Sequence, residues 1–103
     1  MNLTQEDWAE QMEHDKSAVI LDVRTHEEWD EGIIPNAVML DIHKGSEFIE
    51  GLQSLDKSKS YYVYCKAGGR SLQACHIMKQ MGFEKAYNLT GGITQWTGNI
   101  TQP

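Results

Sequence analysis

Cysteine is scarce in this sequence, which has only two, Cys65 and Cys75, among its 103 residues. Their number and spacing match neither a disulfide framework nor a zinc site, so we expect two reduced thiols, no metal and no other cofactor. The first residues lack the basic segment and following apolar segment of a secretory leader, and no apolar run is long enough to span a membrane. We therefore expect a cytoplasmic protein without a membrane partner.

Proline is also scarce, with two residues, and the sequence contains neither a low-complexity tract nor an internal repeat. A chain of 103 residues has room for one hydrophobic core but not for two. The sequence therefore predicts a single domain over residues 1–103.

Basic residues are outnumbered, because 9 Lys and Arg stand against 15 Asp and Glu, which gives a formal net charge of −6. This balance argues against nucleic acid as a partner. The charge is uneven, since residues 1–50 hold 13 acidic and 3 basic side chains, and residues 51–103 hold 2 and 6. Cys65 lies in the basic half, where a small anionic substrate could be attracted. A solvated surface with no steering role is the simpler alternative.

Short apolar runs alternate with helical patterns along the chain. We expect strands at residues 18–21, 37–40, 60–64 and 86–89, and helices at 5–14, 26–31, 47–55, 71–81 and 93–96. Thr4 and Thr25 are placed to cap the first two helices, and Thr25 forms the capping-box pattern with Glu28. The alternation predicts an α/β fold, with a mostly parallel central sheet that carries helices on both faces.

Cys65 lies between the apolar strand Tyr61–Tyr64 and the helix expected from Ser71. In a parallel sheet this is the carboxyl end of a strand, where ligand sites are found. Gly68 and Gly69 allow backbone conformations in which successive N–H groups turn inward and form an anion-binding nest. Such a nest at a helix N-terminus favours a thiolate over a thiol, as do Lys66 and Arg70 beside it. The loop therefore predicts a reactive cysteine with a lowered pKa.

Three segments resemble, in order, the signatures of one known family: Leu21 to Arg24 with Glu28-Trp29 and Gly32 to Ala37, then Tyr64 to Ser71, and finally Asn88 to Ile93 with Trp96. On these motifs the chain resembles a single-domain rhodanese, a sulfurtransferase, over nearly its whole length. Ile33, Asn36 and Trp29 depart from the family, which more often has His, Gly and Phe or Tyr there. These departures concern local packing and partner surfaces rather than the nucleophile.

The resemblance implies a rhodanese-like fold and a persulfide reaction at Cys65. The cysteine takes a sulfane sulfur from a donor such as thiosulfate and passes it to cyanide or a thiol. The substrate is then held by the loop residues Lys66, Ala67, Gly68, Gly69 and Arg70, mostly through backbone N–H groups. Two alternatives remain: a persulfide carrier that a protein desulfurase charges, and a non-catalytic binding module. The module is disfavoured because the chain keeps the cysteine and both glycines.

Each feature of the loop also has a simpler interpretation. Lys66 can be a solvated surface residue, and Arg70 can pair with a carboxylate of the scaffold. A cysteine-dependent phosphatase also places Cys and Arg around an anion, but with one residue more between them than the four that separate Cys65 from Arg70. The shorter loop suits a single sulfur atom better than a tetrahedral phosphate.

The remaining candidates have structural interpretations as their first choice. Cys75 lies on the helix expected from Ser71, and we expect it to be a small residue buried in the hydrophobic core. The alternative is a resolving thiol that forms a disulfide with Cys65. Asp22 and Arg24 are expected to form a scaffold ion pair rather than a catalytic one. The four histidines share no local spacing, and the tryptophans are expected in the core or at its rim, although the resemblance also places Trp96 at the wall of the active site.

Overall fold

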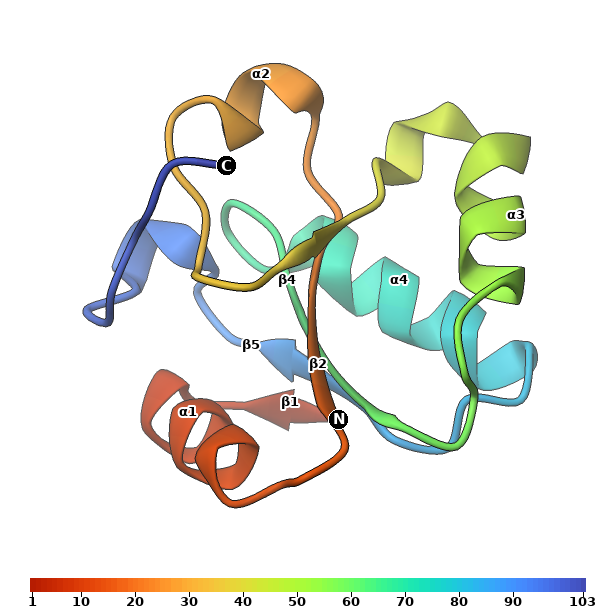
Figure 1. The fold of residues 1–103 in the computed structure, drawn as a ribbon, viewed down its shortest axis with the longest axis horizontal. Helices are drawn as coiled ribbons and strands as arrows, with labels where there is room; N and C mark the ends of the chain where they lie inside the picture. The colour runs from red at the N-terminus through yellow and green to blue at the C-terminus, as the bar shows by residue number, and fades with distance from the viewer.

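The computed structural model describes all 103 residues, and a parallel five-stranded sheet runs through its centre (Figure 1). The strands are β1 (Asn2–Leu3), β2 (Ala18–Asp22), β3 (Val38–Met39), β4 (Ser60–Tyr64) and β5 (Ala86–Leu89). Their order across the sheet is β1-β5-β4-β2-β3, and every neighbouring pair is parallel. The predicted α/β fold is confirmed.

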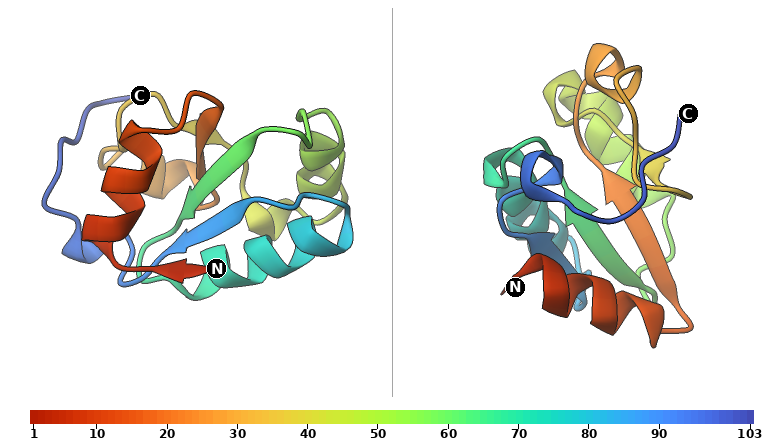
Figure 2. Two further views of the ribbon diagram at one scale, coloured as in Figure 1. Left: turned by 90° about the horizontal axis from the view of Figure 1, so that it is seen from below. Right: turned by 90° about the vertical axis from the view of Figure 1, so that its left-hand side faces the viewer.

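Helices cover both faces of the sheet, as the two views of Figure 2 show. They are α1 (Gln5–Glu13), α2 (His26–Trp29), α3 (Ser46–Gln53) and α4 (Gly69–Gln80), with 3-10 turns η1 (Ile42–Lys44) and η2 (Ile93–Gln95). α1 packs on one face, whereas α3 and α4 pack on the other. None of these helices is both long and apolar enough to cross a membrane.

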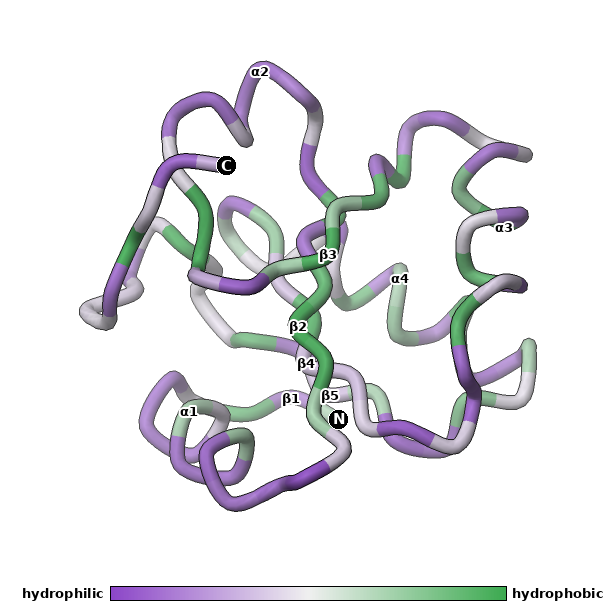
Figure 3. Tube along the Cα trace, in the orientation of Figure 1, coloured by the Kyte–Doolittle hydropathy of each residue, from purple (hydrophilic) through white to green (hydrophobic).

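β4 is the central strand, and all five of its residues are buried. Side chains alternate across a strand, so Tyr61 and Val63 enter the core formed with α3 and α4, while Tyr62 and Tyr64 pack against Trp8 of α1. A strand that is buried on both faces reads as a continuous apolar run. Figure 3 shows a mostly hydrophobic run in β2 as well, whereas α2 is hydrophilic. This core fixes where β4 ends and where Cys65 begins the next loop.

Local sequence signals account for the starts of the first two helices. The Thr4 side chain accepts a hydrogen bond from the Asp7 N–H at 3.2 Å. Thr25 and Glu28 form the predicted capping box at the start of α2. Both caps satisfy backbone N–H groups that a helix leaves without partners in its first turn. The capping predictions are confirmed.

The structure adds two pairings that the sequence does not predict. β1 is only two residues long, too short for a periodic pattern, and it forms because Asn2 and Leu3 pair with Asn88 and Leu89 of β5. The C-terminal tail returns to the segment after α2, where Ile33 and Thr101 exchange two backbone hydrogen bonds of 2.8 Å. Figure 1 shows this tail ending beside α2. α4 also begins at Gly69, so that Gly69 and Arg70 belong to the helix rather than to the preceding loop.

Candidate active site

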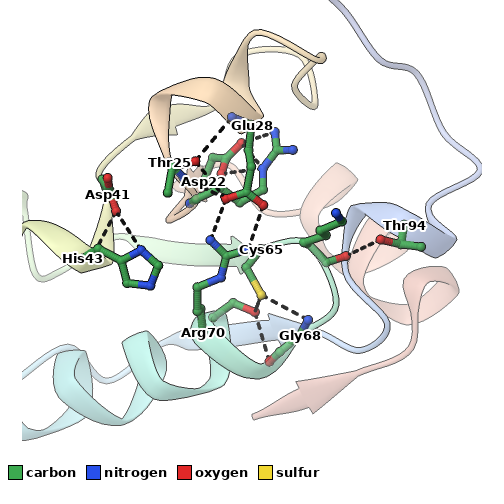
Figure 4. A network of polar contacts seen from close by, with 12 residues as sticks. Asp22, Thr25, Glu28, Asp41, His43, Cys65, Gly68, Arg70 and Thr94 are labelled. Carbon is green, nitrogen blue, oxygen red and sulfur yellow. Dashed lines mark hydrogen bonds and ion pairs between the residues drawn. The ribbon is translucent and has the colours of Figure 1, made fainter.

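Cys65 directly follows β4 at the carboxyl edge of the sheet, and its residue is 1% exposed. The Gly68 N–H donates a hydrogen bond to its Sγ at 3.1 Å, and the Ser71 hydroxyl lies within donating distance at 3.3 Å. Residues 65–68 form the turn between β4 and α4, here called the Cys65 loop, and Figure 4 shows the sulfur turned toward its inside. The strand end, the turn and the first residues of α4 therefore converge on one sulfur atom.

The surroundings of Cys65 lower the pKa of its thiol. Burial removes the sulfur from water and raises the pKa, but hydrogen bonds from the Ser71 side chain and from the backbone of Ser71, Gly68 and Ala67 outweigh this effect. Hydrogen bonds to the charged form stabilise a thiolate selectively. The Cys65 loop thus favours a thiolate that is shielded from bulk water.

Only one of the two loop glycines needs its conformational freedom. Gly68 has φ of +109°, in the left-handed region where a side chain is strained, and it precedes the first residue of α4. Gly69 does not have a positive φ, and a Cβ built there would meet no atom within 4 Å. The expectation that both glycines take conformations closed to other residues is therefore wrong for Gly69, which is an ordinary first residue of the helix.

Arg70 forms an ion pair with Glu28. This is the simpler interpretation of Arg70, in which it pairs with a carboxylate of the scaffold. Its two terminal nitrogens donate to the two carboxylate oxygens at 2.7 and 2.8 Å. Glu28 also accepts from the Thr25 backbone N–H and hydroxyl, so one carboxylate joins α2 to the start of α4 (Figure 4). The hydrogen bonds with Arg70 lower the Glu28 pKa to about 2 in spite of partial burial. Arg70 also lies near enough to Cys65 for an electrostatic interaction between the guanidinium and the thiolate.

The Glu28–Arg70 pair gives a prediction for stability against pH. The Glu28 pKa falls from 4.5 to about 2 on folding, so its contribution is fully present above about pH 4.5 and is lost as the pH falls toward 2. We expect Glu28→Gln, which keeps a capping-box side chain, to lower the free energy of unfolding by about 1 kcal/mol near neutral pH. In urea titrations the difference from wild type should shrink steadily below pH 4.5. A difference that stays constant down to pH 2 would contradict this role.

One segment that is distant in sequence, residues 92–94, holds the Cys65 loop from behind. The Ile93 N–H donates to the Cys65 carbonyl at 3.0 Å, and Thr94 donates to the Lys66 carbonyl from its N–H at 3.1 Å and its hydroxyl at 2.8 Å. Gly92 lies directly behind the loop, and a Cβ there would be 2.3 Å from the Lys66 carbonyl oxygen. The Lys66 side chain is exposed and makes no ion pair. The third signature thus acts as a clamp, which only the three-dimensional structure shows.

Asp22 and Arg24 form the predicted scaffold ion pair. The Arg24 guanidinium donates to Asp22 at 2.8 Å and to the Gly32 carbonyl at 2.7 Å, and the two side chains are 3% and 0% exposed. The pair therefore anchors the segment after α2 to the end of β2. The guanidinium also lies 5.5 Å from the centre of the Tyr64 ring. These contacts are structural, because every strong hydrogen bond of the pair stays within the scaffold.

Trp96 packs at the core on the face of the sheet that α1 covers, which is the first of the two positions expected for it. Its ring packs edge-on against Trp8 at 5.4 Å, and its indole N–H donates to the Asn99 carbonyl at 3.1 Å. It therefore completes the core between the sheet and α1. Two histidines approach carboxylates at the surface: His26 lies 3.8 Å from Asp30, and His43 lies 3.9 Å from Asp41. No group of three or more His, Cys, Asp or Glu residues is arranged to hold a metal ion.

Cys75 is completely buried on α4, within the core that includes Met78 and Phe83. Burial raises the pKa of its thiol to about 12, so it stays protonated at neutral pH. We expect Cys75→Ala to lower the free energy of unfolding by about 1 to 2 kcal/mol through the cavity it leaves, with sulfur transfer unchanged. Denaturant titration and an activity assay on the same sample test this. A large loss of transfer in a stably folded variant would instead indicate the resolving-thiol role.

Comparison with known proteins decides the family. A family model described as the rhodanese-like domain matches residues 5–99. The chain belongs to the rhodanese-like family. YtwF of Bacillus subtilis is 37% identical over 94 residues, which are 91% of this chain and 86% of YtwF. A protein of Allochromatium vinosum named sulfurtransferase is 33% identical over 81 residues, 79% of this chain and 73% of its own length.

Solved structures of rhodanese-like proteins match the fold over nearly the whole chain. A rhodanese-like domain protein from Staphylococcus aureus superimposes with a TM-score of 0.85 at 28% identity, covering 99% of this chain and 97% of the other. A rhodanese-related protein from Thermoplasma volcanium gives a TM-score of 0.83 at 28% identity, with 99% and 98% covered. The predicted rhodanese-like fold is confirmed, and the relatives that are named sulfurtransferases support a transferase role for this rhodanese-like domain.

Proposed function

We propose that this rhodanese-like domain transfers a sulfane sulfur through a persulfide on Cys65, from thiosulfate or a similar small anionic donor to cyanide or a thiol. One observation carries the proposal: Sγ receives hydrogen bonds from Gly68 and Ser71 at the carboxyl end of β4. These donors lower the Cys65 pKa and are placed to stabilise charge on sulfur. Family relatives named sulfurtransferases point the same way.

Loading of the enzyme is a displacement at divalent sulfur. The Cys65 thiolate attacks the outer sulfur of thiosulfate, a new S–S bond forms, and the old S–S bond breaks. Sulfite leaves with the electron pair, so the total charge is conserved and no redox partner is needed. The thiolate is already the reacting form, so the step requires no general base.

Unloading repeats the displacement at the terminal sulfur of the persulfide. Cyanide or a thiolate attacks that sulfur, thiocyanate or a new persulfide leaves, and the Cys65 thiolate is restored. Between the two steps the terminal sulfur carries negative charge. We assign its stabilisation to the backbone N–H groups of Ala67, Gly68, Gly69 and Arg70, and to Lys66 as a free surface cation. A cavity of about 220 Å³, lined in part by Lys66, Thr94 and Ile100, lies next to Lys66.

Steady-state kinetics test the proposal directly. Thiocyanate formation from thiosulfate and cyanide should show the parallel-line pattern of a ping-pong mechanism, because sulfite leaves before cyanide reacts. Release of phosphate from a phosphomonoester should stay at background. Intersecting lines, or turnover of the phosphomonoester that depends on Cys65, would contradict the proposed reaction.

A second candidate, a persulfide carrier charged by a protein desulfurase, is favoured by one specific contact. Both terminal nitrogens of Arg70 are committed to Glu28, so the mouth of the loop offers a small dianion less free positive charge than its sequence suggests. A desulfurase delivers sulfur from its own persulfide and does not depend on that charge. Loading by a cysteine desulfurase with cysteine, in the absence of any loading by thiosulfate, would assign the carrier role.

A further inference from the structure

One side chain outside the Cys65 loop holds both groups that donate hydrogen bonds to Sγ. Asn88 of β5 is 3% exposed, and its Nδ2 donates to the Gly68 carbonyl at 3.2 Å. Its Oδ1 accepts a short hydrogen bond from the Ser71 hydroxyl. Gly68 and Ser71 are the residues whose N–H and O–H face the sulfur. The Asn88 side chain makes no hydrogen bond with Cys65, so any effect on the sulfur passes through these two residues.

The orientation of the Asn88 amide follows from its partners. The Gly68 carbonyl can only accept, so the amide group that faces it must be the NH₂. The second hydrogen of the NH₂ is donated to Oδ1 of Asn2 at 2.9 Å. A flipped amide would place two oxygens against each other and lose both bonds. The carbonyl oxygen of Asn88 is therefore fixed toward Ser71.

The Ser71 hydroxyl has one proton but three acceptors within reach. These are Oδ1 of Asn88, Sγ of Cys65 at 3.3 Å and the Gly68 carbonyl at 3.2 Å. The bond to the Gly68 carbonyl is local, three residues back along the chain, and such bonds form readily for serine. Because Asn88 already donates to that carbonyl, the carbonyl competes less for the Ser71 proton. The amide oxygen and the sulfur are then the two main competing acceptors for that proton.

We propose that Asn88 is a positioning residue for the sulfur chemistry of Cys65, holding Gly68 and the Ser71 hydroxyl so that the hydroxyl proton turns to sulfur when sulfur becomes charged. A charged acceptor attracts a donor more strongly than a neutral amide oxygen, so the proton moves to the thiolate or persulfide and returns to Asn88 when the charge leaves. The hydrogen-bond donors to the sulfur are therefore already in place before the reaction begins. This inference rests on the proposed function for its role in transfer, but its effect on the thiol does not.

The other charged groups around Cys65 stay unchanged in the test. Arg70 at the start of α4 lies near the sulfur and is paired with Glu28 of α2, and the Asp22–Arg24 pair lies at the end of β2. Lys66 follows in the loop itself and is exposed. None of these five residues is bonded to the Asn88 side chain, whose partners are Asn2, Gly68 and Ser71.

The test is the pH dependence of Cys65 alkylation by iodoacetamide in wild type, Asn88→Leu, Ser71→Ala and the double variant. Leucine is close to asparagine in size and removes all three hydrogen bonds of the amide. Asn88→Ser, whose side chain is too short to reach the Gly68 carbonyl, replaces it if the leucine variant does not fold. Each single variant should move the apparent Cys65 pKa up by about one pH unit, a tenfold loss of thiolate below the pKa. The double variant should move it by less than the sum.

Cys75→Ala is the matched control, because it weakens the same helix without touching the network. It should lower the stability and leave the alkylation profile unchanged. A wild-type profile in a folded Asn88 variant, or full additivity of the two single changes, would overturn the proposal. Alkylation needs no sulfur donor, so a normal pH shift in a protein that fails to transfer sulfur would refute the proposed function alone.

Discussion

Cys65→Ala is expected to reduce sulfur transfer by about 10⁴-fold or more while the chain still folds. In the proposed reaction the Cys65 sulfur is the nucleophile of the loading step and the leaving group of the unloading step. The second thiol cannot replace it, since Cys75 is buried on α4. Alanine removes one atom from a position that packs at the edge of the core, so only a small loss of stability is expected. Thiocyanate formation and a denaturant titration measure the two effects separately.

Cys65→Ser and Cys75→Ala are the two controls for this experiment. Serine keeps the hydrogen-bonding geometry of the loop but cannot form a persulfide, so it should be as inactive as alanine. Cys75→Ala keeps the nucleophile and should stay active. Transfer that persists in Cys65→Ala, or that disappears equally in Cys75→Ala, would show that the reaction does not run through Cys65.

Gly92→Ala is the second change with a large expected effect, although residue 92 has no chemistry of its own. Its φ is +62°, and a Cβ would lie 2.3 Å from the Lys66 carbonyl oxygen and 2.6 Å from the Ala67 nitrogen. These are backbone atoms of the Cys65 loop, so the loop itself must move. We expect a loss of about 3 kcal/mol or more in the free energy of unfolding. Displacement of the loop should also cost about 100-fold in transfer.

Gly45→Ala is the control that separates backbone strain from displacement of the loop. Gly45 has φ of +57°, but a Cβ there would meet no atom within 4 Å. It should lose stability through the unfavourable φ and keep its rate of transfer. Equal rates of transfer in folded Gly92→Ala and Gly45→Ala would contradict the clamp role of residue 92.

The parts of the site that follow from local chemistry could be predicted from the sequence. Tyr61–Tyr64 read as a buried strand because both faces of β4 are covered, and this places Cys65 at the carboxyl edge. The Thr25–Glu28 capping box is a local pattern and forms as predicted. The α/β class of the fold follows from the alternation of strand and helix patterns along the chain. The roles of the loop residues in sulfur transfer remain predictions.

The parts that depend on long-range contacts could not be predicted in the same way. Glu28 forms an ion pair with Arg70, which lies 42 residues later in the sequence. The capping-box pattern does not predict this second partner of the Glu28 carboxylate. Asn88 reaches Ser71 only because β5 lies beside β4 in the sheet. The packing of Trp96 against Trp8 depends on the position of α1, which no local pattern gives. Spacing in the sequence carries no information on these distances.

The most direct test of the central claim is the intact mass of the protein after incubation with thiosulfate and then with cyanide, with peptide mapping of any added sulfur. The account predicts a gain of one sulfur atom on Cys65 of the wild type, its loss on addition of cyanide, and no gain on Cys65→Ala. A protein that gains no sulfur from thiosulfate or from a cysteine desulfurase, or that gains it at another residue, would contradict the account.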